Sequence, residues 1–194
     1  MPRRITIIQG HPDKADDHLC HALAEAYRTG AESAGFEVRN IVVGSLTFPL
    51  IRNKQEFEHG ERPDEIREAQ SMIRTSDHLL IVYPLWLGTM PALLKGFLEQ
   101  VFRYDFAFEP EAGGKFKKLL KGRSARVVIT MGMPALAYRY FFGAHSLKSL
   151  ERNILKFAGI SPVRESLFGM VENVSDATRR KWLQQMQRLG AAGR

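Results

Sequence analysis

Apolar and polar residues alternate along the chain in a pattern that predicts five strands, each followed by a helix. Short runs of β-branched and apolar residues predict buried strands, and they cover residues 4–9, 36–43, 77–83, 125–130 and 162–171. Apolar residues at three- and four-residue spacing predict helices, and they cover residues 17–33, 64–75, 91–102, 144–158 and 175–189. Two long connections, 44–63 and 103–122, are predicted to be irregular.

This alternation predicts an α/β protein with a flavodoxin-like three-layer α/β/α fold. Strands that alternate with helices form parallel sheets with right-handed crossovers and with helices on both faces. Five such units are the number found in a five-stranded flavodoxin-like sheet, whose strand order is 2-1-3-4-5. The chain has 194 residues, no internal repeats and no linker-like segment. We therefore expect a single domain over residues 1–194.

Three loops are expected to meet at one edge of this sheet. In the order 2-1-3-4-5 the switch point, where open α/β sheets bind ligands, lies between the first and third strands. The loops at residues 10–17, 84–90 and 131–143 follow the first, third and fourth strands. A ligand site is therefore expected at the carboxyl ends of these strands.

The middle loop offers a flat surface and backbone groups. Trp86 beside Gly88 would place an apolar wall next to a backbone that a planar cofactor can approach closely. The loop between Pro84 and Met90 contains no acid, base or nucleophile, so its chemistry would belong to a bound cofactor. The local residues equally allow Trp86 to be an ordinary core residue.

The first loop offers His11, Lys14 and His18 before the N-terminus of a predicted helix. Such a terminus binds phosphate through its free N–H groups, although three aspartates between residues 13 and 17 oppose an anion. Neither a dinucleotide nor a Walker motif is present. A metal site is an alternative, but the spacing of its candidates matches no zinc pattern, and we expect none. These candidates are His11, His18, Cys20 and His21.

The third loop contains the side chains that could handle charge or protons. Tyr138, Tyr140 and His145 follow the fourth strand, and a histidine near a tyrosine could stabilise negative charge on a ligand. His145 could equally be a solvated residue at a helix start. No Ser-His-Asp or Cys-His arrangement is evident in the loops, so hydrolysis has no support.

Composition narrows the partners and the compartment. The net charge of +7 favours anionic partners, but the basic cluster between Lys115 and Arg123 has no nucleic-acid motif, so no nucleic acid is expected. One cysteine, Cys20, indicates a reducing compartment. The N-terminal apolar run is too short for a signal peptide. The longest apolar run, 79–94, has 16 residues including two prolines. We therefore expect a cytoplasmic protein without membrane insertion.

Residues 84–102 closely resemble the NAD(P)H:quinone oxidoreductases of the flavodoxin-like fold. They read PLWLGTMPALLKGFLEQVF, where that family has the pattern P-x-x-(W/L)-x-x-x-P-A-x-L-K-G-x-x-(D/E)-x-V-F. Weaker similarities occur in the family's order over nearly the whole chain. They are His11, the segment 48–52, Thr130-x-Gly132 and Gly143-x-His145.

The resemblance implies an enzyme, an NAD(P)H dehydrogenase (quinone) that binds FAD or FMN. Hydride would pass from NAD(P)H to flavin N5, and two electrons would then pass to a quinone-like acceptor. The two substrates occupy one pocket in turn in this family, which implies ping-pong kinetics. Family members are commonly homodimers with the flavin at the subunit interface, so a homodimer is expected.

The resemblance also implies roles for residues of the three loops. The backbone amides of residues 85–88 would hold the polar edge of the flavin ring, and residues 130–132 would support it. His145, together with Tyr140, would be catalytic and would stabilise charge at the N1–C2=O2 side of the reduced flavin. The expected cofactor-binding residues are His11, Asp17, His18, Pro84, Leu85, Trp86, Leu87, Gly88, Thr130, Met131 and Gly132.

The chain departs from the family pattern at three places. Residues 16–18 are Asp-Asp-His where the family has a Ser/Thr-x-Asn pattern, which leaves the choice between FAD and FMN open. Met131 replaces the second glycine of a Thr-Gly-Gly turn. The family's tyrosine six residues before the histidine falls on Arg139, so Tyr140 or Tyr138 must substitute for it.

Two other functions are compatible with the same sequence features. One is a flavin-binding ancillary subunit of a potassium-efflux transporter, a role known within the family. The other is a flavodoxin-type electron carrier. The positive net charge argues against a carrier, because such carriers are usually acidic.

Overall fold

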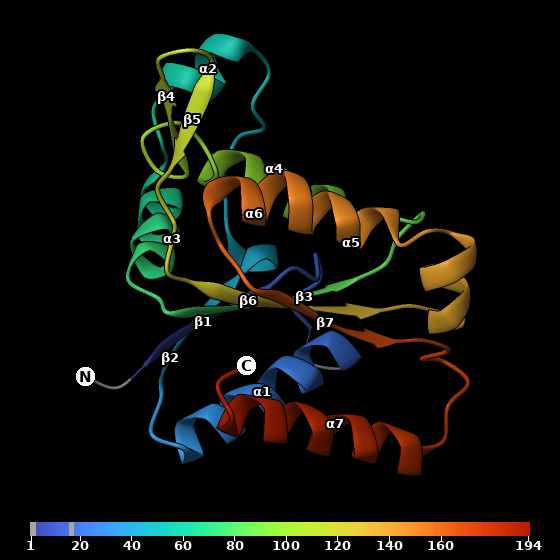
Figure 1. Cartoon of the computed structure of the whole chain (residues 1–194). Coiled ribbons are helices and arrows are strands. Elements are labelled where there is room, and N and C mark those ends of the chain that lie inside the picture. The colour runs from blue at the N-terminus through green and yellow to red at the C-terminus, as the bar shows by residue number, and fades with distance from the viewer. Residues whose placement is uncertain (1–2, 16–17) are drawn as a thin grey trace.

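A five-stranded parallel sheet forms the middle of three layers in the computed structural model, which describes residues 3–15 and 18–194 (Figure 1). The strand order is β2-β1-β3-β6-β7, which is the predicted order 2-1-3-4-5 when only these five strands are counted. The predicted fold class is therefore confirmed. The strands are β1 (Arg4–Gln9), β2 (Glu37–Val42), β3 (His78–Pro84), β6 (Ser124–Thr130) and β7 (Val163–Phe168).

Helices cover both faces of the sheet, as Figure 1 shows. Two of them, α1 (Leu19–Ser33) and α7 (Asp176–Ala191), pack together on one face. The other face carries α3 (Asp64–Arg74), α4 (Ala92–Val101) and a helix built from α5 (His145–Ser149), the π-helical η3 (Leu150–Leu155) and α6 (Lys156–Ala158). In the described part of the chain, no helix combines the length and apolar character needed to cross a membrane.

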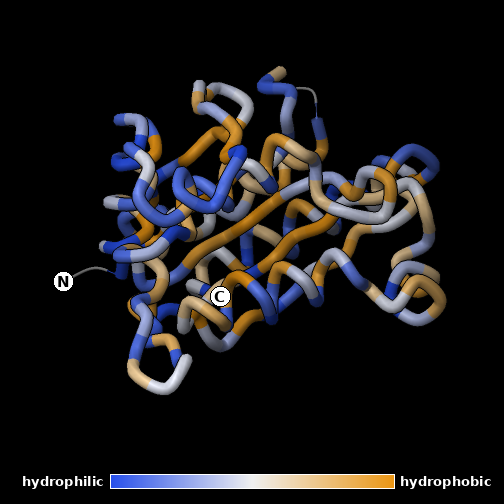
Figure 2. Tube along the Cα trace, turned by 90° about the horizontal axis from the view of Figure 1, so that it is seen from above, coloured by the Kyte–Doolittle hydropathy of each residue, from blue (hydrophilic) through white to orange (hydrophobic). Residues whose placement is uncertain are grey.

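The core is divided by the sheet into two apolar clusters. Every residue of β3 is buried, as expected for the central strand of a sheet covered on both faces. In β1, Ile5 and Ile7 join the cluster under α1 and α7, whereas Ile8 joins the cluster under α3 and α4. Figure 2 shows this arrangement as apolar strands between more polar outer segments. Burial of each such side chain contributes about 1.5–3 kcal/mol.

Helices α1 and α7 pack with their backbones in close contact. A Cβ atom on Gly30 would lie 1.9 Å from the carbonyl oxygen of Gln187, and one on Gly190 would lie 2.0 Å from that of Tyr27. Neither position has room for a side chain. The two glycines therefore set the separation of the helices on this face.

The two long connections are more ordered than predicted. The first contains η1 (Val43–Ser45) and α2 (Lys54–His59), and the second contains a hairpin of β4 (Phe108–Glu111) with β5 (Lys115–Lys118). The prediction that both segments are irregular is wrong at these residues. The buried guanidinium of Arg103 holds the first connection, because it donates to the carbonyl oxygens of Phe57 at 2.9 Å and Gly60 at 2.6 Å.

Candidate functional site

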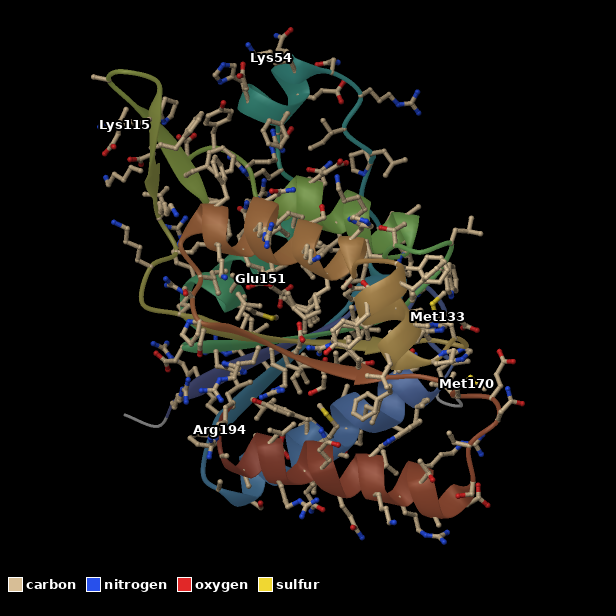
Figure 3. The ribbon with its side chains drawn as sticks, turned by 45° about the vertical axis from the view of Figure 1, so that its right-hand side comes forward. Lys54, Lys115, Met133, Glu151, Met170 and Arg194 are labelled. Carbon is tan, nitrogen blue, oxygen red and sulfur yellow. The ribbon has the colours of Figure 1, made fainter. Side chains whose placement is uncertain are left out.

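A cavity of about 280 Å³ lies at the carboxyl edge of the sheet. Segments that follow β1, β3, β6 and β7 form its walls. The lining residues are His11, His18, Leu19, Cys20, Pro84, Leu85, Trp86, Thr130, Met131, Gly132, Val171 and Glu172. Figure 3 labels Met133 and Met170, which lie at this end of the sheet. The structure thus brings together most of the predicted cofactor-binding residues in one cavity.

The middle loop is a two-residue turn. Trp86 and Thr89 exchange two backbone hydrogen bonds of 2.9 Å each. The two residues between them, Leu87 and Gly88, have φ angles of 48° and 79°. Positive φ at both central positions defines a type I′ turn. Gly adopts this backbone without strain, whereas a leucine there costs about 1–2 kcal/mol.

The expected use of the loop amides needs one correction. The N–H of Leu85 donates to the carbonyl oxygen of Thr130 at 2.8 Å, and the N–H of Trp86 donates to that of Thr89. Both amides are therefore occupied within the protein. The N–H groups of Leu87 and Gly88 have no hydrogen-bond acceptor among the described residues. Of the four amides predicted to bind the flavin ring, only those of Leu87 and Gly88 can donate a hydrogen bond to a ligand.

Trp86 lies at the surface, so the alternative in which it belongs to the core is excluded. Its side chain is 48% exposed. It meets His11 edge to face, with ring centroids 5.9 Å apart and an interplanar angle of 80°. This geometry leaves the indole as one apolar wall of the cavity.

The cavity also contains a contact that joins α1 to β6. The Sγ atom of Cys20 lies 3.1 Å from Oγ1 of Thr130, and both side chains are buried. Burial raises the pKa of the Cys20 thiol to about 11, against a smaller opposing effect of the hydrogen bond to Thr130. Cys20 is therefore a neutral thiol at physiological pH and not a nucleophile.

Three histidines form one wall of the site. The His11 ring stacks on His18 with centroids 3.9 Å apart, and His21 lies 5.5 Å from His11. Burial lowers the pKa of His11, and the positive charges of His18 and His21 act in the same direction. His18 is anchored by Nε2, which lies 3.0 Å from Oδ2 of Asp13.

The histidines are not arranged as a metal site. The Nε2 atom of His21 donates to the carbonyl oxygen of Asp13 at 2.9 Å, and its Nδ1 contacts Oε1 of Gln9. Nδ1 of His11 is held by the backbone of Asp13, 2.9 Å from its carbonyl oxygen and 3.1 Å from its nitrogen. Within residues 3–15 and 18–194, no three His, Cys, Asp or Glu side chains form a group that could hold a metal ion.

The N-terminus of α1 opens on the same cavity through Leu19 and Cys20. No side chain caps its first turn in the described structure. The first N–H groups of a helix and its dipole favour an anion at such a place. Asp17, one of the predicted cofactor-binding residues, lies outside the described residues.

The predicted catalytic residues do not line the cavity. Tyr140 is 77% exposed in the π-helical segment η2 (Ala137–Phe141), and His145 is exposed at the start of α5. Tyr138, the other candidate tyrosine, is buried, and its hydroxyl accepts a hydrogen bond of 3.1 Å from the N–H of Leu147. Tyr138 therefore stabilises the fold at this place. The roles of Tyr140 and His145 stay predictions.

Four cavity residues were not among the predicted cofactor-binding residues. Leu19 and Cys20 belong to the first turn of α1, and Val171 and Glu172 follow β7. Open α/β sheets bind ligands at the carboxyl ends of their strands, and β7 is one of these strands. This principle could therefore have identified Val171 and Glu172. Nothing in the local sequence marks the first pair, because their position depends on how α1 docks on β6.

Comparisons with known proteins agree with this fold. A family profile described as a flavodoxin-like fold matches residues 3–189. An uncharacterized NAD(P)H oxidoreductase of Haemophilus influenzae is 28% identical over 182 residues, which are 92% of this chain and 89% of that protein. Human ribosyldihydronicotinamide dehydrogenase [quinone] is 26% identical over 164 residues, 75% of this chain and 68% of that protein.

A solved structure shows the same fold over almost the whole chain. The NAD(P)H:quinone oxidoreductase from Methanothermobacter marburgensis superposes with a TM-score of 0.81 at 22% identity, covering 98% of this chain and 96% of that one. The predicted resemblance to NAD(P)H:quinone oxidoreductases is confirmed by these relatives. The match over residues 3–189 shows that the chain belongs to the family of the flavodoxin-like fold.

Proposed function

We propose that this protein is a flavin-dependent NAD(P)H oxidoreductase that reduces a quinone-like acceptor. Membership of the family and the names of the two relatives support an oxidoreductase. The observation that carries the proposal is the turn at Leu87 and Gly88, which presents two unpaired N–H groups beside the exposed face of Trp86. A planar heterocycle with a polar edge needs both features.

The remaining residues of the cavity fit the ring of a flavin. Gly132 lines the same cavity as Trp86, and a Cβ atom placed on it would meet no other atom within 4 Å. Its N–H has no hydrogen-bond acceptor in the described part of the protein. We assign it, with the amides of Leu87 and Gly88, to the oxygen and nitrogen atoms along the edge of the ring.

The N-terminus of α1 fits the phosphate of the same cofactor. Its N-cap residue, His18, makes no side-chain capping hydrogen bond, and the terminus lies beside His11 and His18 in the cavity wall. Free helical N–H groups and histidine N–H donors bind phosphate oxygens. This assignment suits FAD and FMN alike, because both carry a phosphate on the ribityl chain.

The bound flavin would supply hydride acceptance from NAD(P)H at N5 and two-electron delivery to the acceptor, in a ping-pong sequence. The residues of this chain bind and orient the cofactor, while the neutral Cys20 thiol and Thr130 exclude water from the interior side of the cavity. We assign to His145 and Tyr140, which lie in α5 and η2 after β6, the stabilisation of charge at the N1–C2=O2 side of the reduced flavin.

The segment around these two residues supports a homodimer. Leu136, Tyr140, Phe141 and Phe142 are between 50% and 83% exposed. Contiguous exposed apolar side chains mark interaction surfaces. We propose that a second copy covers this segment and that His145 and Tyr140 act at the interface, where a partner would close the open side of the cavity.

Steady-state kinetics test the proposed reaction. The flavin-loaded protein is mixed with NADH or NADPH and a soluble benzoquinone, and loss of nicotinamide absorbance is followed while both concentrations are varied. Parallel double-reciprocal lines are expected, because the two substrates use one site in turn. Quinone-dependent rates no higher than those of the same concentration of free flavin would overturn the proposal.

A further inference from the structure

A second cavity lies at the opposite, amino-terminal edge of the sheet. It has a volume of about 290 Å³, and its polar lining residues are Arg3, His78, Ser124, Arg164 and Arg194. These residues come from the starts of β1, β3, β6 and β7 and from the segment after α7. Figure 3 shows Arg194 at this end, away from Met133 and Met170. The cavity is therefore separate from the site proposed for the flavin.

Three buried polar side-chain atoms in this region have no hydrogen-bond partner among residues 3–15 and 18–194. They are the hydroxyl of Tyr27, Nε2 of His78 and Nε of Arg126, whose side chains are 0%, 1% and 6% exposed. The rings of Tyr27 and His78 are stacked, with centroids 6.4 Å apart. Buried donors almost always have partners, because an unmade bond costs about 1–3 kcal/mol. Three orphans in one region point to a missing acceptor.

The hydrogen bonds around Ser124 are compatible with Nε2 of His78 as a donor. Nη2 of Arg3 donates to Oγ of Ser124 at 3.1 Å, and that hydroxyl lies 2.7 Å from Nδ1 of His78. A hydroxyl oxygen has two lone pairs and one hydrogen, so that of Ser124 can accept from Arg3 and also donate to Nδ1. The single proton of the neutral imidazole is then on Nε2. Neutrality is consistent with a pKa of His78 lowered to about 3 by burial and by nearby arginines.

The positive charges of several arginines act on these groups. Besides burial, the positive charges of Arg3, Arg126 and Arg164 lower the pKa of His78. Besides burial, those of Arg164 and Arg194 lower the pKa of Arg126. No carboxylate is among the charges acting on either group. Clustered cations of this kind repel one another, and an anion between them relieves the repulsion. A water molecule could accept the orphan hydrogens but could not neutralise the arginines.

We propose that the amino-edge cavity binds a small oxyanion that carries a phosphate group. Guanidinium groups form forked hydrogen bonds with phosphate oxygens. Such an anion has enough lone pairs to accept from Nε2 of His78 and from the arginines together. The cavity volume lies at the lower end of the range for ligand sites, which favours inorganic phosphate or a small monoester over a nucleotide.

Binding is tested with inorganic phosphate on the full chain. Calorimetric titration is run in chloride buffers of constant ionic strength, with glycerol phosphate as the monoester probe. Arg164→Gln removes an exposed cation of the cavity, and Arg180→Gln removes an exposed cation of α7 as the control for net charge. We expect saturable binding that Arg164→Gln weakens by about tenfold or more and that Arg180→Gln leaves unchanged.

A nuclear magnetic resonance measurement locates the ligand. The Nε2–H signal of His78 is expected to shift as phosphate or glycerol phosphate is added, in proportion to the saturation seen by calorimetry. Either probe can give this result, and the tighter one identifies the source of the phosphate group. Absence of saturable binding, equal weakening by Arg164→Gln and Arg180→Gln, or a His78 signal that does not respond would overturn the proposal and leave water as the occupant.

Discussion

Leu87 and Gly88 occupy successive left-handed positions of one turn, with φ angles of 48° and 79°. The leucine side chain is fully exposed and packs on nothing that would compensate for its strained backbone. Strain of this kind persists where the surrounding structure and function require it. Here the two N–H groups of the turn have no acceptor among the described residues, and the turn adjoins Trp86 in the cavity wall.

Replacing Leu87 by asparagine should stabilise the protein. Asn-Gly is the preferred pair for a type I′ turn, and relief of the leucine strain is expected to add about 1 kcal/mol to the free energy of unfolding. The amide at position 87 is retained, so the flavin affinity of the variant should differ from that of the wild type by no more than about threefold. Chemical denaturation and flavin titration measure the two effects. A less stable Leu87→Asn variant would show that the leucine side chain supports the turn.

Replacing Trp86 by alanine should weaken flavin binding with little loss of stability. Half of the indole is already exposed, so the apo protein loses little buried area, whereas a stacked ring would lose an aromatic contact of about 0.5–1.5 kcal/mol in addition to the area that the indole covers. We expect an affinity loss of about tenfold or more. Fluorescence titration of FMN and FAD gives the affinity.

Trp182 provides the matched control for Trp86. Its ring packs on Phe168 with centroids 5.1 Å apart, in the core cluster under α7 and away from the cavity lining. Trp182→Ala should therefore lower the unfolding free energy but leave the flavin affinity of the folded protein unchanged. If both alanine variants lost affinity equally, the loss would reflect general destabilisation.

Two glycine substitutions should have opposite consequences. Gly30→Ala would place Cβ 1.9 Å from the carbonyl oxygen of Gln187, so α1 and α7 must separate, at a cost of about 3 kcal/mol or more. Gly96→Ala would meet the flexible end of Leu50 at 2.7 Å and Phe48 at an ordinary contact distance of 3.6 Å, and it gains helix propensity of about 1 kcal/mol. Urea denaturation of both variants checks this. Similar losses in the two would contradict the close packing of the helices.

Stability should fall in mild acid partly because of His78. Its folded pKa of about 3 lies below the ordinary value of 6.5, so the unfolded chain takes up the proton first as the pH falls. The folded state therefore loses stability below pH 6.5, by roughly 2 kcal/mol between pH 7 and pH 5 from this group. Arg3, Arg126 and Arg164 face the imidazole and oppose its protonation.

The variant His78→Gln isolates this contribution, because glutamine does not titrate. Its unfolding free energy should decline less than that of the wild type between pH 7 and pH 5, by about the same 2 kcal/mol. Measurements are made in phosphate-free buffer, since the proposed anion would stabilise the cationic cavity. Parallel pH profiles for the two proteins would show that His78 is not buried in its neutral form.

The architecture could be predicted from local patterns because the five strands and their helices are strongly periodic. The β4–β5 hairpin could not, since all four residues of β5 are exposed and no alternation of buried and exposed positions marks the strand. The short helix α2 has no buried residue and was missed for the same reason. Helices and strands without an apolar face produce no periodic pattern of apolar residues, so the sequence does not predict them.

The candidate site was predictable in its location but not in its hydrogen bonding. Sheet topology placed Trp86 and Thr130 at one edge, and both line the cavity. Which amides stay unpaired depends on the exchange between Trp86 and Thr89, a geometry that composition does not reveal. The amino-edge cavity was not predictable at all, because Arg3, His78 and Arg164 come together only in the folded chain.

Flavin binding at the carboxyl edge is the central claim, and visible absorption tests it most directly. The protein is purified under native conditions, its spectrum is recorded before and after addition of NADPH, and any flavin is released and identified. A protein freed of cofactor is then titrated with FMN and FAD. We predict a yellow protein that NADPH bleaches, or saturable uptake of one flavin per chain. A colourless protein that takes up neither flavin would contradict the account.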